Sequence, residues 1–376
     1  MNPEKPPLIK LSDSAISGLE TQYLQEALAL NELSYHGSFI SKIQTYFEDL
    51  FEDKYVVPLN SGTSAIHLSL LMAGVKTNDE VLCQSFTYAA TAFPITYIGA
   101  IPIFIGSEKQ SWNMCPITLE EAIKERIKKH KKPSAIIAVH AYGMPCKMKE
   151  IMAIASKYDI PIIEDAAEAL GSKIQAKWCG SLGHFGVLSF NTNKLVTSAG
   201  GGLLICSTEK EKNKAIYLAS QAKSQRGGYN HEHIGFNYKM NNINASILAA
   251  QLEQLPRYLE QRRHIHDFYL NEIKSFSEIR LQQAYSQTVV SNFWLNCIVC
   301  ENQEIKSRLI IKLKENNIEF RDLWKPMHLQ PIFKKSRYYG NDFAENLFLT
   351  GLSLPSGNTL TSEELERIKQ VFTSLC

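Results

Sequence analysis

Short apolar runs alternate with segments of helical periodicity between about Asn60 and Cys206. The apolar runs are VVPLN, EVLCQ, IPIFI, SAIIAVH, PIIED, VLSF and GLLIC, and the helical segments include AIHLSLLMAGV, TAFPITYIGA and MKEIMAIASKY. Continuous apolar runs separated by amphipathic helices are typical of parallel strands that are buried on both faces. The pattern therefore predicts a doubly wound α/β domain with a mostly parallel sheet.

The pattern changes after about residue 240. The segment NNINASILAAQLEQLPRYLEQRRHIHDFYLNEI has helical spacing interrupted by Pro256, which predicts two long helices or one kinked helix. Beyond residue 275, short strands such as NFWLNCIV and IEFRDLW are mixed with helices. We therefore expect a large α/β domain over residues 1–260 and a small α+β domain over residues 261–376.

Composition places the chain among globular proteins and limits its partners. It has 376 residues, 44% of them hydrophobic and 21% charged, which suits two domains or one large domain with a smaller one appended. The 40 basic residues nearly cancel the 38 acidic ones, so no overall field attracts nucleic acid or an anionic membrane. The basic run KERIKKHKKP is interpreted as a solvated helix end. Any anion must therefore be bound locally.

The eight cysteines form no paired CxxC modules; they stand at positions 83, 115, 146, 179, 206, 297, 300 and 376. Cys297 and Cys300 lie in the apolar run WLNCIVC and are interpreted as core residues rather than metal or redox ligands. The N-terminal MNPEKPPLIKLSD lacks an apolar targeting segment, and no run of 18 apolar residues occurs. We expect a reducing, cytoplasmic location, with no metal site and no membrane contact.

The first candidate for chemistry is NSGTSA, residues 60–65, where a strand ends and a helix begins. Gly62 allows the turn, and Thr63 and Ser64 offer donors at a helix N-terminus, an arrangement that favours a phosphate. An ordinary helix cap explains the same residues.

The second candidate is IIEDAAEALGS, in which two acids close an apolar strand. Asp165, at a buried strand end, is placed to pair with a cation such as a protonated pyridine nitrogen, or else to cap the strand. Glu168 is placed to orient a ring hydroxyl or to begin a helix. The segment alone leaves these alternatives open.

The third candidate is Lys194 in GHFGVLSFNTNKLVTSAGGGLLIC, where it is the only charged residue between His184 and Glu209. A lysine held among buried strands becomes a nucleophilic amine, as a Schiff base requires. Most lysines are surface residues, but the uncharged surroundings favour a functional role here.

With Ser189 five residues before Lys194, this order of motifs closely resembles the DegT/DnrJ/EryC1/StrS family of sugar aminotransferases. These are pyridoxal-phosphate (PLP) enzymes with the aspartate-aminotransferase fold, fold type I, and the resemblance runs from about Tyr35 to Lys369. The segments FRDLWKPMHLQPIF and LPSG are most similar to the enzymes of the bacillosamine pathway that make UDP-4-amino-4,6-dideoxy-N-acetylglucosamine.

The resemblance implies a role for each motif. Lys194 would form the Schiff base and then carry a proton, and Asp165 would keep the pyridine nitrogen protonated so that the ring accepts electrons. Glu168 would lie beside the phenolic oxygen. The remaining implied cofactor contacts are Gly62, Thr63, Ser64 and Ser189 to the phosphate, Tyr88 over the ring, and Asn237 to the phosphate of the neighbouring subunit. A homodimer with shared sites follows from Asn237, whereas Tyr88 also fits plain strand packing with Phe86.

The resemblance also implies contacts to the sugar nucleotide. These residues are Tyr35, His36, Gly37, Ser38, Arg321, Trp324, Lys325 and His328. Aromatic and basic side chains suit a nucleotide diphosphate through stacking and charge-assisted hydrogen bonds. Core packing of Trp324 and a surface ion pair of Arg321 are the alternatives.

Two motifs depart from the family pattern. The common TTGEGG is here Thr197 to Gly202 without its acid, as in the UDP-sugar branch, and the common NYRM is here NYKM, with Lys239 replacing the arginine. The expected reaction moves the amino group of L-glutamate to C4 of a UDP-4-keto-6-deoxy-N-acetylhexosamine. The alternatives are a GDP- or TDP-linked sugar aminated at C3 or C4, and a non-catalytic PLP-fold sensor or scaffold. Lys194 argues against the related dehydratases, which carry histidine at that position.

Overall fold

The computed structural model describes residues 6–224 and 229–375. Its largest sheet has eight strands in the order β1-β9-β8-β5-β4-β2-β3-β14. The strand bounds are β1 Tyr55–Leu59, β2 Glu80–Gln84, β3 Ile101–Ile105, β4 Ala135–Val139, β5 Ile162–Asp165, β8 Phe185–Ser189, β9 Gly202–Cys206 and β14 Tyr338–Tyr339. All pairs are parallel except those of β9, which runs antiparallel to β1 and β8. Each predicted apolar run forms a strand here, so the mostly parallel α/β sheet is confirmed.

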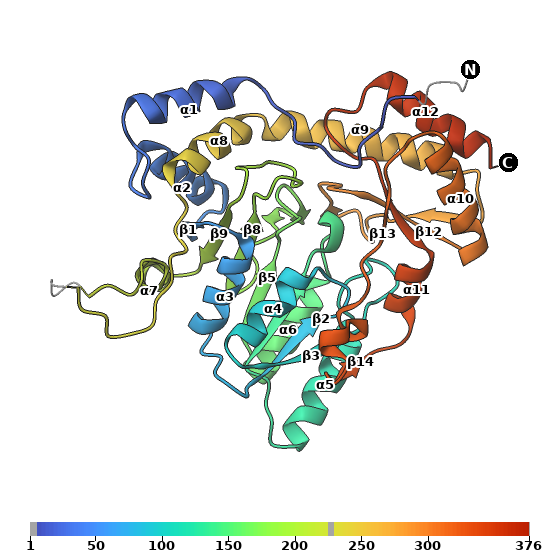
Figure 1. Ribbon diagram of the computed structural model, residues 1–376. Coiled ribbons are helices and arrows are strands. Elements are labelled where there is room, and N and C mark those ends of the chain that lie inside the picture. The colour runs from blue at the N-terminus through green and yellow to red at the C-terminus, as the bar shows by residue number, and fades with distance from the viewer. Residues whose placement is uncertain (1–5, 225–228, 376) are drawn as a thin grey trace.

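Helices cover both faces of this sheet (Figure 1). Neighbouring strand residues point to opposite sides, so Val57 and Leu59 pack into one layer and Val56 into the other. The first layer contains α3 Gly62–Met72, α4 Ala89–Tyr97 and α7 Glu209–Ala219; the second contains α2 Ser38–Leu50, α5 Pro116–Lys128, α6 Met148–Tyr158 and α8 Asn242–Glu253. Burial on both faces explains why the strands are continuously apolar.

One residue, Gln254, separates α8 from α9, Leu255–Ile273, so the segment with Pro256 forms two helices. Pro256 lies in the first turn of α9, where its missing N–H breaks no helical hydrogen bond. In Figure 1, α9 runs from above the large sheet to the C-terminal unit. The short α1 Leu19–Ala29 packs on α8.

The C-terminal unit is built on an antiparallel sheet of order β10-β12-β15-β13. Its elements are β10 Ile279–Leu281, β12 Asn296–Cys300, β13 Arg321–Asp322, β15 Gly351–Leu354, α10 Gln303–Glu315, α11 Phe343–Thr350 and α12 Ser362–Thr373. Ile9 pairs with Ile318 and is fully buried in this unit's core. The N-terminal segment lies beside the C-terminal helix α12 (Figure 1), where Arg367 donates to the Pro7 carbonyl. The N-terminal segment thus packs on the small unit, and the boundary near residue 260 stays a prediction.

Short elements complete the fold. They are the 3₁₀ turns η1 Ala141–Gly143, η2 Met327–Leu329 and η3 Pro331–Phe333, and a small sheet of β6 Lys173–Ile174, β7 Lys177–Trp178 and β11 Val289–Val290. Cys297 and Cys300 are 0% and 2% exposed within the small unit, as expected of core residues, whereas Cys376 lies outside the described residues.

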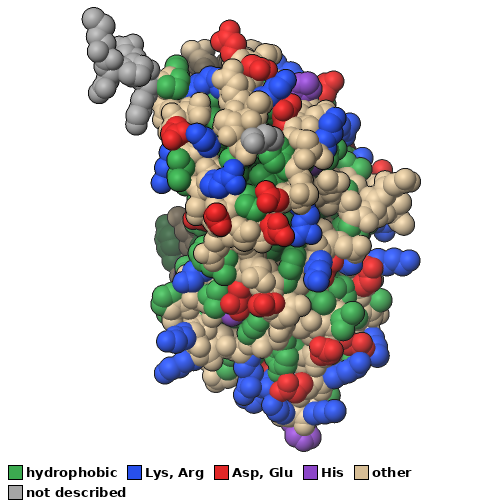
Figure 2. Space-filling view, turned by 90° about the vertical axis from the view of Figure 1, so that its right-hand side faces the viewer, with side chains coloured by type: hydrophobic (Ala, Val, Ile, Leu, Met, Phe, Trp, Pro, Cys, Tyr) green, Lys and Arg blue, Asp and Glu red, His purple; other side chains and the backbone are tan. Residues whose placement is uncertain are grey.

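The surface is mixed in charge. The basic run, residues 124–133, covers the last turn of α5 and the residues after it; there Lys129 pairs with Glu125 and Lys132 with Asp159. Figure 2 shows basic and acidic side chains interspersed over the face turned to the viewer. Among the helices of the described residues, none has the length and hydropathy needed to span a bilayer.

Candidate active site

A cleft of about 620 Å³ lies where β4, β5 and β8 end, bordered on its other side by residues of the small unit. In open α/β sheets, ligands bind at the carboxyl edge of the strands. Of the residues predicted from the sequence, the cleft brings together Gly62, Thr63, Tyr88, Asp165, Glu168, Ser189, Lys194, Arg321 and Trp324. Segments far apart in the chain therefore meet at one place.

One end of the cleft is a tight backbone cradle at the start of α3. The Ser61 side chain caps this helix by accepting from the Ser64 N–H at 3.1 Å, which leaves other first-turn N–H groups open. A methyl group on Gly202 would lie 2.3 Å from the Ser61 carbonyl carbon, and one on Gly62 would lie 3.2 Å from Cβ of Ser189. At Gly202 only a glycine allows the two backbones to approach so closely, whereas a side chain at Gly62 would require Ser189 to shift slightly. The resulting cradle suits a phosphate.

The cradle differs in one respect from the sequence interpretation. The Ser64 hydroxyl is buried and donates to Asn60 Oδ1 at 2.6 Å, so it does not line the cleft. Asn60 and Ser61 do line it. Both belong to the NSGTSA motif, but their positions before Gly62 gave no sign that they would face the cleft.

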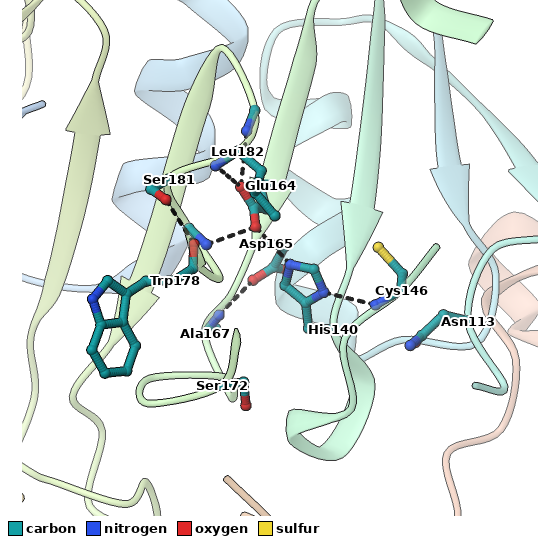
Figure 3. Close-up of polar contacts among 12 residues, drawn as sticks. Asn113, His140, Cys146, Glu164, Asp165, Ala167, Ser172, Trp178, Ser181 and Leu182 are labelled. Atoms are coloured by element: carbon teal, nitrogen blue, oxygen red, sulfur yellow. Dashed lines mark hydrogen bonds and ion pairs between the residues drawn. The ribbon is translucent and has the colours of Figure 1, made fainter. Parts of the chain in front are cut away.

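Asp165 ends β5 with its carboxylate 3% exposed. Its two oxygens accept from Thr91 Oγ1 at 2.7 Å and from the Ala167 N–H at 3.1 Å (Figure 3 shows the latter). Burial raises the pKa of Asp165, although these hydrogen bonds and the charge of Lys194 oppose the rise. A buried carboxylate with no direct cationic partner among the described residues is suited to a cationic group of a ligand. Thr91, which holds it, was not predicted.

Glu164, on the opposite side of β5, is fully buried and fully hydrogen-bonded. Its oxygens accept from the N–H groups of Gly180, Leu182 and Gly183 at 2.7, 2.8 and 2.9 Å. Figure 3 shows the hydrogen bond from Leu182. Glu164 also accepts from His140 Nε2 at 2.8 Å. Burial alone would raise the pKa of Glu164, but these donors outweigh it and the pKa is lowered.

His140, Glu164 and Cys179 form a cluster whose ligand-type atoms lie within 4.8 Å of one another. The ring proton of His140 sits on Nε2, because Nδ1 accepts from the Cys146 N–H at 3.0 Å. The hydrogen bonds of His140 and Glu164 tie the loop after β7 and the end of β4 to β5. This network anchors the strand end that carries Asp165.

Lys194 follows β8 in a turn closed by its N–H to the Asn191 carbonyl. Its ammonium lies 3.0 Å from Glu168 Oε1 and 4.2 Å from the ring centroid of Trp294, with the side chain 14% exposed. The indole N–H of Trp294 donates to the Asn193 carbonyl at 2.7 Å. Trp294, which was not predicted, therefore contacts the lysine and also holds the turn that carries it.

Glu168 is buried between Lys194 and η1. Its second oxygen accepts from the Tyr142 N–H at 2.8 Å, and burial raises the pKa of Glu168 to about 7 although the charge of Lys194 opposes the rise. Tyr142 has φ 57° and ψ 20°, a left-handed conformation that costs a non-glycine residue about 1–2 kcal/mol. This strained turn directs the N–H at Glu168. Tyr142 also was not predicted.

An aromatic wall continues from Tyr142 toward the small unit. The Tyr142 ring stacks on the Trp324 ring with 4.2 Å between centroids, and the Tyr142 hydroxyl accepts from the backbone N–H of Trp324 at 2.9 Å. Tyr88, 60% exposed at the start of α4, lies 6.5 Å from Trp324 between ring centroids. Arg321 on the same side is exposed and pairs with Glu319.

The other predicted residues do not line the cleft in this chain: Tyr35, His36, Gly37, Ser38, Ser64, Asn237, Lys325 and His328. Ser38 is bound to Glu32 through both its hydroxyl and its N–H. Both ring nitrogens of His328 are engaged, one with Ser85 and the other with Glu345. The exposed Asn237 accepts from the Gln221 side chain and is not among the residues that line the cleft.

A lysine paired with a buried glutamate, a buried aspartate and a backbone cradle suited to a phosphate, on a fold type I scaffold, are typical of PLP-dependent aminotransferases. The chain belongs to the DegT/DnrJ/EryC1/StrS aminotransferase family, whose model matches residues 14–373. It is a member of a family of PLP-dependent nucleotide-sugar aminotransferases.

Three similar proteins support this assignment. The chain is 40% identical over 371 residues to EpsN of Bacillus subtilis (strain 168), named as a pyridoxal phosphate-dependent aminotransferase, with 98% and 95% of the two chains covered. It is 32% identical over 357 residues to GDP-perosamine synthase of Escherichia coli O157:H7, covering 95% of each. The PLP-form structure of sugar aminotransferase Spr1654 from Streptococcus pneumoniae matches with a TM-score of 0.88 at 25% identity, covering 99% and 98%.

Proposed function

We propose that this chain transfers the amino group of L-glutamate to C4 of a UDP-4-keto-6-deoxy-N-acetylhexosamine, giving UDP-4-amino-4,6-dideoxy-N-acetylglucosamine. The observation that carries the transfer chemistry is the position of Lys194, held between Glu168 and Trp294 in a cleft that also contains Asp165. The choice of a UDP-sugar rests on the resemblance of residues 320–333 and on the acid-free loop before Gly202.

The residues of the cleft fit pyridoxal phosphate. The glycine cradle at Gly62 and Gly202, closed by Ser189, would bind the phosphate, and the buried Asp165 would face the pyridine nitrogen. When bound, the cofactor supplies the electron sink that transamination requires. The amine of Lys194 would take up and return the proton at the substrate carbon, while Glu168 and Trp294 orient that amine.

For the sugar nucleotide we propose contacts from Arg321 and Trp324, which lie in the cleft wall. We propose that Lys325 also contacts the nucleotide, from the rim of the cleft. His328 would have to give up its hydrogen bonds to Ser85 and Glu345 to reach a substrate.

We further propose a homodimer in which one chain completes the cleft of the other. Asn237 would reach the neighbouring phosphate, and the nearby residues Tyr35 to Ser38 would approach the neighbouring sugar; Lys239 lies over the Tyr35 ring at 4.3 Å. Exposed apolar side chains support such an interface, among them Tyr229 at 88% and Ile234 at 85% exposed.

We also propose a cytoplasmic location. The seven cysteines of the described residues are free, as is usual for proteins of a reducing compartment.

A second candidate keeps the chemistry and changes the nucleotide. The similarity to GDP-perosamine synthase over most of both chains favours a GDP-linked keto sugar as this alternative. Both substrates require the same lysine and acid, so the cleft residues described above do not discriminate between them.

The test is to incubate the cofactor-loaded protein and L-glutamate with UDP-, GDP- and TDP-linked 4-keto-6-deoxy sugars. We expect an amino sugar only from the UDP-N-acetyl substrate, detected by mass spectrometry. Turnover of the GDP-linked sugar alone would refute the UDP assignment. A scaffold without catalysis predicts that glutamate leaves the visible absorption of the bound cofactor unchanged, whereas our proposal predicts a shift that Lys194→Ala abolishes.

A further inference from the structure

Arg262, in the middle of α9, is buried without an acidic partner. Its side chain is 1% exposed, and its guanidinium donates to the Trp294 carbonyl at 2.7 Å and to Ser12 Oγ at 3.2 Å. Its Nε has no hydrogen-bond partner. Across residues 6–224 and 229–375, no carboxylate forms an ion pair with this guanidinium. Buried arginines are ordinarily paired with acids.

The guanidinium is nevertheless charged at neutral pH. Burial lowers the pKa of Arg262 to about 9, which is still above 7. Two neutral oxygens solvate this cation only in part, and an unpaired buried charge is costly to a fold. An anion that binds nearby therefore gains an attraction that no group of the described chain already satisfies.

Both acceptors of Arg262 belong to the cleft wall. Ser12 and Trp294 each line the cleft, on the side formed by the N-terminal segment and the small unit. Ser12 Oγ accepts from Arg262, so its own hydroxyl proton remains available, and among the described residues no acceptor takes it. A hydroxyl that accepts from a cation becomes a stronger donor. The charge of Arg262 is thereby presented to the cleft through Ser12.

We propose that Ser12, polarised by Arg262, forms a subsite for an anionic group of the substrate, either a carboxylate or a phosphate. Ser12 contacts the anion, and Arg262 is a positioning residue that acts through it. The subsite is made by residues other than the Gly62 cradle, so it is separate from the site assigned to the cofactor phosphate. This inference rests on the proposed function, in which both L-glutamate and the nucleotide sugar bring anionic groups into one cleft in turn.

The test measures affinity rather than turnover. Glutarate, a dicarboxylate that cannot be transaminated, and UDP are titrated calorimetrically into the cofactor-loaded protein, with neutral uridine as a reference. In Ser12→Ala we expect at least one of the two anions to bind roughly 10- to 100-fold more weakly, as the loss of a charge-assisted hydrogen bond predicts, while uridine is unaffected. Arg262→Lys, which keeps a charge, should lose less affinity than Arg262→Met.

A matched control is Ser17→Ala. Ser17 lies in the same N-terminal segment, but its hydroxyl donates to Glu20 and it does not line the cleft, so this variant should bind like the wild type. Weakening of glutarate alone assigns the subsite to a carboxylate, weakening of UDP alone assigns it to the diphosphate, and weakening of both assigns it to each in turn.

Unchanged affinity for both anions in Ser12→Ala and in Arg262→Met would overturn the subsite and leave Arg262 with a structural role only. Failure of both anions to bind the wild type would overturn it too. Because no amino transfer is required, these outcomes are independent of the proposed function. A protein that fails to aminate any UDP-sugar, yet loses anion affinity in Ser12→Ala, refutes the proposed substrate and keeps the subsite.

Discussion

The ammonium of Lys194 lies 3.0 Å from a carboxylate oxygen of Glu168, inside a cleft where Glu168 is only 8% exposed. The second oxygen of the same carboxylate is held by the Tyr142 N–H, so the acid cannot turn away from the lysine without losing a hydrogen bond. This pairing fixes the direction of the amine. It also places an acid that titrates near neutral pH beside the group proposed to move a proton.

Replacement of Glu168 by glutamine should change how stability depends on pH. The pKa of Glu168 is raised from 4.5 to about 7 by burial, so the folded state holds this proton more tightly than the unfolded chain. Its contribution is present below 4.5 and is lost as the pH rises to about 7. Relative to Glu168→Gln, the wild type should lose at most about 3 kcal/mol over that window. Denaturant unfolding of the cofactor-free proteins at several pH values measures the difference, and parallel curves would contradict the prediction.

Replacement of Asp165 by asparagine should lower the rate of amino transfer by at least about 100-fold, because the negative charge that we propose to face the cofactor is lost while the shape is kept. Thr91→Val is the graded comparison: it removes one hydrogen bond to Asp165 and should cost roughly 10-fold. Single-turnover kinetics with glutamate measures both. Equal rates for Asp165→Asn and the wild type would remove Asp165 from the proposed machinery.

Much of the large domain was predictable because its strands are buried on both faces. A strand such as Ile101–Ile105 is apolar at every position, and the polar residues that follow such strands collect at one edge of a parallel sheet. That regularity brought Asp165, Ser189 and Lys194 together in the cleft, as expected. The antiparallel direction of β9 could not be predicted, because an apolar run in the sequence does not reveal the direction of its strand.

The residues that orient Lys194 were not predictable in the same way. Trp294 donates a hydrogen bond to Asn193, in the turn that carries Lys194, although it lies 101 residues further along the chain. Tyr142 directs its N–H at Glu168 by adopting a left-handed backbone conformation that a tyrosine disfavours. Neither feature has a local pattern. Asn237 and Tyr35 are a different case, since the roles expected of them depend on a second copy of the chain, and these predictions stay open.

The buried His266 should make the protein less stable on mild acidification. Its Nδ1 pairs with Asn296 Oδ1 at 2.8 Å and its ring stacks on Phe293 at 3.7 Å, and burial lowers the pKa of His266 below 6.5. The folded state therefore binds this proton less tightly than the unfolded chain, so stability present above 6.5 is lost as the pH falls below it. We expect His266→Gln, which does not titrate, to reduce this loss of stability. Denaturation midpoints between about pH 7 and pH 5 test the sign, and an unchanged slope would contradict it.

Replacement of Gly202 by alanine should weaken cofactor binding. The added methyl would lie 2.3 Å from the Ser61 carbonyl carbon and 2.4 Å from the Gly62 nitrogen, so the first turn of α3 must move away from Ser189. Loss of one or two backbone donors to a phosphate predicts roughly 10- to 100-fold weaker PLP binding, measured by titrating the cofactor-free protein.

Gly18→Ala is the control. The positive φ of Gly18 makes alanine unfavourable there, but nothing lies within 4 Å of the new methyl, and Gly18 does not line the cleft. That variant should lose about 1 kcal/mol of stability and keep its cofactor affinity. Equal PLP affinity in the two variants would show that the approach of β9 to α3 does not form the phosphate cradle.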